Sequence, residues 1–393
     1  MRVLHLSWEY PPVVHGGLGR HVDALTRAQA AAGDEVGVVC LADDLTAGHR
    51  AQPQAPALEV RDGVWVRRVR APVVADPVAD LASSMAVVQQ RMRSTAAGLA
   101  ADVVHAHDWM VADAARAVAD DLGCPMVLTV HATELGRREG RLDGPVPQAV
   151  HEAECRAVVA ADRVVVCSTP MVDEVVEHGA ERSAVCVVPG AVEGSRWCTS
   201  PAQRGSARAR FGAKGPLVVA AGRLEWEKGF STLLRAMPAV LAAHPACSVV
   251  LAGTGSYEPQ LRALAGDLGL DGSLELPGRL GTPDLAGLFA AADVVVVPSR
   301  YEPFGLVALE AQAAGAAVVA TAVGGLGEIV EDGRTGRLFA PGDVDRLAAI
   351  LTVLLGDPAG VAGLAAGGTA KARQRTWAGV ADALRFVYPD APG

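Results

Sequence analysis

Residues 293–310 read DVVVVPSRYEPFGLVALE, a run of valines, a turn with proline and glycine, and an apolar stretch that carries two glutamates. A continuous valine run predicts a strand that is buried on both faces, as in a parallel sheet. Pro303 and Gly305 mark a change from strand to helix, since proline is favoured in the first turn of a helix. The stretch therefore predicts a strand–turn–helix unit, with Glu302 at the turn and Glu310 inside the helix.

The same alternation of Val-rich runs and longer Ala/Leu-rich amphipathic runs continues along the chain. The runs predict strands at 3–8, 35–41, 64–70, 103–106, 126–131, 163–167, 185–189, 217–221, 248–252, 274–276, 294–298 and 317–320. Strands that alternate with helices indicate parallel sheets covered on both faces. We therefore expect an α/β chain of two Rossmann-like, doubly wound domains that face each other across a cleft, with ligands at the carboxyl ends of the strands.

A segment rich in Gly, Ser, Pro and Arg at 189–215 predicts the break between the domains. The predicted boundaries are 1–195 for an N-terminal domain and 196–372 for a C-terminal domain. A final helix at 373–393 is expected to return to the N-terminal domain.

Composition excludes several classes of protein. The 393 residues carry a net charge of −9, which argues against a nucleic-acid binder. The seven cysteines form no C-x-x-C pair, so we expect small buried hydrophobic residues in a reducing compartment. The first residues read as a strand and not as a signal peptide, and no run of about 18 apolar residues predicts a membrane span. A cytoplasmic protein is expected.

Two glycine-containing loops follow predicted strands. In the loop at 9–20, Gly16 and Gly17 precede a helix, where backbone N–H groups and the helix dipole favour an anion. The alternative is a flexible loop with a glycine N-cap. In GRLEWEKG at 222–229, Arg223 and Lys228 are placed to bind a diphosphate, Arg as a fork and Lys as a point charge. The alternative is a pair of solvated cations near the two glutamates of the loop.

Histidines also stand at strand ends, in HAHDW at 105–109 and HATE at 131–134. His107, Asp108 and His131 are placed to reach a cleft, although a strand-end histidine is often only a cap or a packed residue. A metal site is not expected, because His105 and His107 are expected on alternating faces of a strand and nothing supplies a convincing third ligand. Asp343 and Asp345 are interpreted as caps at a helix start.

The turn at 301–306 offers the backbone N–H groups of Phe304, Gly305 and Leu306 to an anion. Glu302 then faces the mouth of the cleft, and Glu310 lies within reach of hydroxyls beside that anion. A ligand with sugar, diphosphate and ribose in a row fits this order. The alternative is an N-terminal carboxylate that satisfies the helix dipole, together with a surface Glu310.

Glu302 and Glu310, with seven residues between them, resemble the E-x7-E motif of retaining glycosyltransferases of family four, which have the GT-B fold. The similarity covers nearly the whole chain and is closest to actinobacterial glycogen-synthase-like α-1,4-glucosyltransferases. It rests on the motifs GGL at 16–18, HAHDW, HATE, GRLEWEKG, SRYEPFGL at 299–306 and GGLGE at 324–328.

The resemblance implies a role for each matching residue. The catalytic residues would be His131 and Glu302, both at the donor sugar, and Glu310 would bind the ribose. The donor diphosphate would lie against Gly16, Gly17, Arg223, Lys228, Phe304, Gly305 and Leu306. The acceptor side would be formed by His107, Asp108, Trp109 and Glu134. No metal or other cofactor is implied.

The implied activity is retaining transfer of a hexose, expected to be glucose in α-1,4 linkage, from an ADP-, UDP- or GDP-linked sugar to a glucan or oligosaccharide. Two departures matter. Val14 stands where bacterial glycogen synthases have a lysine, which argues against a storage-glycogen synthase. Gly190-Ala191 stands where many family members have Asn-Gly, which affects the expected hinge.

Two other functions stay open. One is a mannosyltransferase that uses GDP-mannose with a polysaccharide or lipid acceptor, for which residues 91–93 and 137–138 are candidate basic patches. The other is a non-catalytic protein that binds nucleotide sugars, against which the intact set of motif residues argues.

Overall fold

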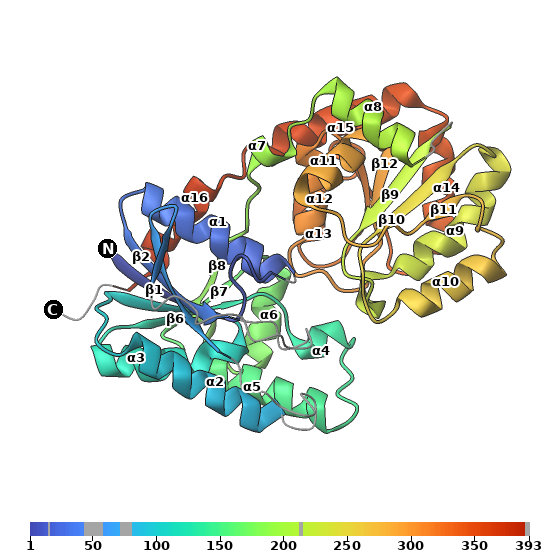
Figure 1. Cartoon of the computed structure of the whole chain (residues 1–393). Coiled ribbons are helices and arrows are strands. Elements are labelled where there is room, and N and C mark those ends of the chain that lie inside the picture. Colours follow the sequence, from blue (N-terminus) through green and yellow to red (C-terminus); the bar gives the residue numbers. More distant parts are fainter. Residues whose placement is uncertain (15, 43–57, 71–80, 212–214, 390–393) are drawn as a thin grey trace. The chain divides into compact units, whose positions relative to one another are not determined.

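The computed structural model describes residues 1–14, 16–42, 58–70, 81–211 and 215–389 (Figure 1). They form two compact units: unit 1 contains Met1–Gly190 and the segment that begins at Trp377, and unit 2 contains Ala191–Thr376. The predicted boundary at 195 falls inside unit 2. No single helix of the described ranges is long and apolar enough to cross a membrane, and one bent helix pair, Val344–Leu355 with Pro358–Ala372, passes that test by length and composition only.

Unit 1 is built on a sheet with the strand order β3-β4-β2-β1-β5-β6-β7-β8, in which only the β3–β4 pair is antiparallel. Its strands are β1 (Arg2–Ser7), β2 (Glu35–Leu41), β3 (Glu59–Arg61), β4 (Val64–Val69), β5 (Val103–His107), β6 (Met126–Val130), β7 (Arg163–Val166) and β8 (Val185–Val187). Its helices are α1 (Gly17–Ala31), α2 (Leu81–Ala96), η1 (Trp109–Val111), α3 (Ala112–Leu122), α4 (Glu134–Arg137), α5 (Pro145–Ala160), α6 (Pro170–Glu177), η2 (Arg182–Ala184) and α16 (Trp377–Val387). The last helix, α16, is red in Figure 1 and packs against the blue α1. The first and last helices of the chain therefore belong to the same unit.

Unit 2 has an all-parallel sheet in the order β11-β10-β9-β12-β13-β14. Its strands are β9 (Leu217–Ala221), β10 (Ser248–Ala252), β11 (Leu274–Glu275), β12 (Val294–Val297), β13 (Ala317–Thr321) and β14 (Arg337–Phe339). Its helices are α7 (Gly194–Trp197), α8 (Pro201–Arg210), η3 (Trp226–Lys228), α9 (Phe230–Ala243), α10 (Glu258–Asp267), α11 (Thr282–Ala291), α12 (Leu306–Ala313), α13 (Leu326–Ile329), α14 (Val344–Leu355) and α15 (Pro358–Ala372).

The valine run of β12 explains the two cores of unit 2. Val294 and Val296 belong to one buried cluster, whereas Val295 and Val297 belong to another. Because successive side chains of a strand point to opposite faces, a sheet with a core on each face needs an apolar residue at every position. The predicted fold class, two parallel α/β units, is confirmed.

Every predicted strand is present, and two short strands were missed. β3 and β14 have three residues each and contain Glu59, Arg61 and Arg337, so they carry no apolar run. Asp343 accepts a hydrogen bond from the backbone N–H of Arg346, which confirms it as the cap of α14. All seven cysteines are free; four are buried, and Cys198 is exposed, contrary to expectation.

The strand order reverses direction between β1 and β5 in unit 1 and between β9 and β12 in unit 2. In doubly wound sheets, ligands bind outside the carboxyl ends of the strands at such a switch point. The loops that follow these four strands are therefore the first places to look for a site.

Candidate active site

The loop at 222–229 follows β9, at the switch point of unit 2. Nη2 of Arg223 lies 2.8 Å from Oε1 of Glu227, and the Arg223 side chain is 48% exposed. Nζ of Lys228 lies 2.9 Å from Oε2 of Glu302, and both side chains are mostly covered. Arg223 thus pairs with a glutamate of its own loop, as expected for the alternative of a solvated cation beside these glutamates. Lys228 instead reaches the glutamate that follows β12.

Close backbone packing brings Lys228 to Glu302. Gly229 has φ +65°, and a Cβ there would overlap the carbonyl oxygen of Pro298 at the end of β12. The backbone N–H of Arg300 donates to the carbonyl of Glu227 at 2.8 Å, which holds the two loops together. A left-handed residue with no room for a side chain has to be glycine. The final glycine of GRLEWEKG is therefore required by this approach.

Glu302 is held from several directions. Ser299 donates its hydroxyl to Oε2 of Glu302 at 2.9 Å, and Thr321 donates to the carbonyl of Ser299 at 2.6 Å. The backbone N–H of Gly325 donates to the carbonyl of Glu302 at 3.0 Å. A Cβ on Gly324, which has φ +47°, would overlap that same carbonyl oxygen. The glycine pair of GGLGE thus allows the loop after β13 to lie against the backbone of Glu302.

Helix α12 begins where the turn predicts. Gly305, with φ +104°, is its N-cap, and Leu306 is its first residue. The first N–H groups of a helix have no partner inside it, so this end of α12 is able to receive an anion. Glu310 lies inside α12 and is only 4% exposed, so the alternative of a surface glutamate is wrong.

In unit 1, the loop after β1 leads into α1. Gly16 is the N-cap of α1, and its N–H donates to Oε2 of Glu9 at 3.2 Å. Among the described residues, a Cβ added to Gly16 or Gly17 would meet no atom within 4 Å. Within the described part of unit 1, these two glycines therefore have room on the side where a Cβ would lie. His15, which precedes the pair, lies outside the described residues.

His131 follows β6 and is tied to the end of β5. Its backbone N–H donates to Oδ1 of Asp108 at 2.7 Å. Asp108 has φ +63° and is buried, and burial raises the pKa of its carboxyl to about 7. Burial lowers the pKa of His131 to about 4, so its imidazole is neutral at pH 7. A neutral imidazole has one donor and one acceptor nitrogen, and this gives His131 a choice of two tautomers.

The structure overturns the sequence argument against a cluster of histidines. His105 and His107 lie on the same face of β5, with stacked rings whose centroids are 4.5 Å apart, since the side-chain period of a strand is two residues. His21 of α1 was not considered as a third member. The rings of His21, His107 and His131 bring one nitrogen each within 4.8 Å of the others. The predicted absence of a metal stays a prediction, but its geometric reason is wrong.

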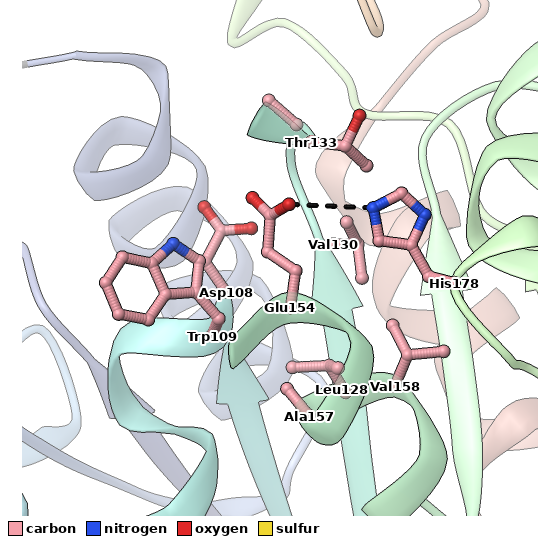
Figure 2. A pocket seen from close by; sticks show the side chains of 10 residues that line it. Asp108, Trp109, Leu128, Val130, Thr133, Glu154, Ala157, Val158 and His178 are labelled. Carbon is pink, nitrogen blue, oxygen red and sulfur yellow. Dashed lines mark ion pairs between the residues drawn. The ribbon is translucent and has the colours of Figure 1, made fainter. Parts of the chain in front are cut away.

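Two of the residues predicted for the acceptor side, Asp108 and Trp109, line a small pocket beside the loop at 131–134 (Figure 2). Thr133 lines it as well, together with Glu154 of α5 and His178. Both carboxylate oxygens of Glu154 accept from the N–H of Glu134 at 2.9 Å. This buried carboxylate anchors the start of α4, and it was missed because nothing in the sequence around α5 marks it.

Ionic contacts fix the sides of this pocket. Oε2 of Glu154 lies 3.6 Å from Nε2 of His178, a distance that indicates an ion pair and not a hydrogen bond (Figure 2). Burial would lower the pKa of His178, but Glu154 and the carbonyl of Glu174 outweigh it and raise that pKa. Oε1 of Glu134 lies 2.5 Å from Nε of Arg138. Glu134, which was predicted for the acceptor side, is therefore an ion-pair partner of the arginines at the end of its own helix.

The predicted basic patches do not form an apolar, cationic surface. Met92 is fully buried, and Arg93 pairs with Asp121 at 2.7 Å. Arg137 and Arg138 both lie beside Glu134. Arg91 donates to the carbonyl of Arg70 and keeps its charge, but buried Met92 offers no apolar surface beside it, so the described residues of these patches do not favour a lipid surface.

The comparisons with known proteins agree over the whole chain. Residues 15–196 match the family described as Glycosyltransferase Family 4, and residues 204–372 match Glycosyl transferases group 1. A glycogen synthase of Mycobacterium tuberculosis is 38% identical over 99% of this chain and 94% of that protein. A D-inositol 3-phosphate glycosyltransferase of Acidothermus cellulolyticus is 33% identical over 96% of this chain and 86% of that protein. The solved sucrose-phosphate synthase of Thermosynechococcus elongatus shares the fold, with a TM-score of 0.83, 24% identity and coverage of 98% and 97% of the two chains.

Proposed function

This chain belongs to the family 4 glycosyltransferases, and on that premise we propose that it transfers glucose, with retention, from a nucleoside-diphosphate sugar to a glucan or oligosaccharide. The single observation that carries the proposal is the Lys228–Glu302 pair at the switch point of unit 2. The proposal is supported because a cation suited to a phosphate and a carboxylate suited to a sugar carbon lie side by side there, at the end of a parallel sheet where such ligands bind.

The first step is departure of the nucleoside diphosphate. The bond between the sugar C1 and the phosphate oxygen breaks, and negative charge develops on the phosphate. Lys228, Arg223 and the N-terminus of α12 stabilise that charge, the largest catalytic effect in this proposal. When the phosphate takes the ammonium of Lys228 as its partner, the carboxylate of Glu302 becomes available to the sugar.

The sugar carbon gains positive charge as the leaving group departs. Glu302 stabilises this oxocarbenium-like carbon, and the hydroxyl of Ser299, 2.9 Å from Oε2, holds the carboxylate in place. The acceptor hydroxyl attacks on the face that the phosphate leaves, and its proton passes to the departing phosphate oxygen. The new C1–O bond therefore has the configuration of the old one, and no second base is needed.

The remaining assignments complete the proposal. Glu310 binds the ribose hydroxyls, and its burial supports a contact role over a solvated one. His131 contacts the sugar as a neutral imidazole. Asp108 and Trp109 form the acceptor side, whereas His107 is fully buried and stands behind His131. The reaction takes place in the cytoplasm, and the seven free cysteines support this.

A second candidate acceptor is a phosphorylated polyol, favoured by the 33% identity to the D-inositol 3-phosphate glycosyltransferase. A mannosyl donor with a lipid acceptor is less favoured, because Arg93, Arg137 and Arg138 are engaged with carboxylates.

A screen of donors against acceptors tests the proposal. UDP-glucose, ADP-glucose and GDP-mannose are each combined with malto-oligosaccharides, manno-oligosaccharides and inositol phosphate, and product masses are followed with time. We expect malto-oligosaccharides to grow by one hexose with a glucose donor. Growth of inositol phosphate alone would select the second candidate, and nucleotide release without any enlarged acceptor would reject the proposal.

A further inference from the structure

A chain of side-chain hydrogen bonds runs through the core of unit 1 and ends at His131. Nε2 of His131 lies 3.3 Å from Nδ1 of His107, and Nε2 of His107 lies 3.0 Å from Nδ1 of His5. Nε2 of His5 lies 2.8 Å from Oε1 of Gln29 on α1. The register explains the alignment, because His5 of β1 stands opposite His105 of β5, and His107 follows on the same face.

The chain continues beyond Gln29 to the C-terminal segment. Nε2 of Gln29 donates to the hydroxyl of Tyr388 at 2.8 Å, and this hydroxyl lies 2.9 Å from Nδ1 of His105. Nε2 of His105 lies 2.7 Å from Oγ1 of Thr129. His5, Gln29, His105 and Tyr388 are all buried, so water does not compete for these bonds. The residue that follows α16 is thereby connected to the loop after β6.

Burial keeps the imidazoles of the chain uncharged. It lowers the pKa of His5 to about 4 and holds the pKa values of His105 and His107 well below the usual range. Each neutral ring has one N–H and one lone pair. If one ring nitrogen carries the proton and donates, the other therefore has the lone pair and accepts.

The amide of Gln29 decides the direction of the whole chain. Its NH₂ end donates to Tyr388, so its carbonyl end faces His5 and accepts from Nε2–H of that ring. Nδ1 of His5 is then a lone pair and accepts from Nε2–H of His107. By the same rule, Nδ1 of His107 accepts from Nε2–H of His131. Rotating the amide by 180° would exchange its donor and acceptor ends, and the proton of each imidazole in the chain would then lie on the other ring nitrogen.

We propose that Gln29 and Tyr388 are positioning residues that act through His5 and His107 to hold His131 in one tautomer, with its proton on Nε2 and its lone pair on Nδ1. No described residue is seen to donate to Nδ1 of His131. That nitrogen is therefore available to accept a hydrogen bond from a hydroxyl of the sugar. The last point rests on the proposed function, whereas the tautomer itself does not.

The same rings do not need a cation to explain their closeness. Both nitrogens of His107 already take part in the chain, one toward His5 and one toward His131. His21 meets His131 edge-on, with ring centroids 4.8 Å apart, and contacts Trp377 in the same manner at 5.0 Å. An edge-to-face contact is favourable without any shared ion.

The experiment measures the tautomers of the full chain by NMR, with ¹⁵N label in the histidines only and assignment by single-histidine variants. In the ligand-free protein, Nδ1 of His5, His107 and His131 should show the shift of a nitrogen without a proton. Tyr388→Phe removes the hydroxyl that accepts from the amide of Gln29, and should give a mixture of tautomers in the three rings. Gln29→Met, of nearly the same volume, should do so as well.

The matched control is Tyr10→Phe. Tyr10 is a fully buried tyrosine of the same unit, whose hydroxyl lies 3.2 Å from Oγ1 of Thr26 and outside the chain. The Tyr10→Phe substitution should leave the tautomers of His5, His107 and His131 unchanged. Thermal unfolding of all variants shows that each is folded at the temperature of the spectra. Protonation of Nδ1 of His131 in the parent, or unchanged tautomers in both Tyr388→Phe and Gln29→Met, would overturn the proposal.

Turnover separates this inference from the proposed function. If the lone pair of His131 acts on the sugar, kcat/KM in Tyr388→Phe should fall to the fraction of molecules that keep the tautomer, about twofold for an equal mixture. Tyr10→Phe should keep the parent value. A mixture of tautomers with unchanged kcat/KM would refute the positioning role. Absence of glucosyl transfer by the parent would reject the proposed function and leave the spectra unaffected.

Discussion

Replacement of Lys228 by alanine should reduce kcat/KM for any accepted donor by about 30- to 1000-fold. This corresponds to about 2–4 kcal/mol of lost transition-state stabilisation. Lys228 is the cation nearest to Glu302, at 2.9 Å, and its charge is needed most when the phosphate departs. Because the loss arises in the transition state, kcat should fall more than the affinity for the nucleoside diphosphate.

The same substitution also has a cost in the ligand-free protein. Without the ammonium, Oε2 of Glu302 keeps only the hydroxyl of Ser299 as a close partner from that side. The Lys228 and Glu302 side chains are 19% and 14% exposed, between a surface pair and a buried one. We therefore expect the free energy of unfolding to fall by about 1–3 kcal/mol. This loss leaves a folded enzyme, so activity and stability are separable.

Lys371→Ala is the matched control. Its ammonium lies 2.8 Å from Oε1 of Glu331 in the same unit, with a similar exposure of 21%, and neither residue of this pair belongs to a motif. Urea unfolding gives the stability of both variants. Steady-state kinetics give kcat and kcat/KM, and calorimetry gives the affinity for the nucleoside diphosphate. The phosphate role of Lys228 is refuted if Lys228→Ala keeps near-parent kcat/KM, or if Lys371→Ala loses as much.

Four further outcomes are expected. Glu302→Gln should lower kcat strongly and change donor KM little, because its contact strengthens as positive charge develops; a normal kcat would remove Glu302 from the mechanism. Glu310→Gln should weaken binding of the free nucleoside diphosphate by about 1.5–3 kcal/mol in calorimetry, and unchanged affinity would exclude the ribose role. Turnover should survive EDTA, since cationic side chains take the place of a metal; loss restored by Mn²⁺ or Mg²⁺ would contradict this. The urea midpoint should fall between pH 7 and pH 5, because buried His5 and His131 have pKa values of about 4 and the unfolded chain takes up their protons below about 6.5. Asp108, with its pKa raised to about 7, and His178, whose pKa is also raised, oppose this, and a midpoint that rises on acidification would show that these two groups dominate.

The fold followed from the sequence because buried strands of a parallel sheet carry a signal at every residue. The run at 294–297 is apolar throughout, since its side chains enter two cores. β14 carries no such run, as its first residue is Arg337, and it became visible only through its pairing with β13. Short edge strands depend on their neighbours more than on their own residues.

The positions of the motif residues in the loops after β9 and β12 could be predicted from the sequence, but the contacts between them could not. The sequence placed Glu302 and Lys228 at strand ends, and it held no information that their side chains lie 2.9 Å apart. Ser299 was not recognised, although it directly follows the valine strand and donates to Glu302. Contacts between loops distant in sequence depend on packing, as at Gly229 and Gly324, where a Cβ would overlap a carbonyl of another loop.

The histidines of unit 1 show a wrong inference from a correct pattern. The sequence argument expects His105 and His107 on opposite faces of their strand, whereas residues two apart share a face and the two rings stack there. Gln29 and Tyr388 are more than 350 positions apart in the sequence and share a hydrogen bond. No local pattern connects them, because the C-terminal segment packs on α1 only after the chain has folded.

The most direct test of the central claim is the NMR spectrum of the product. A glucose donor and a malto-oligosaccharide are incubated with the enzyme, and the anomeric proton and linkage of the added residue are read as the product first forms. Retaining transfer predicts a new α-1,4-linked glucose, with no β signal at early times. A β anomer would contradict the mechanism at Glu302 and Lys228, and free glucose with no new glycosidic bond would contradict the assignment as a transferase.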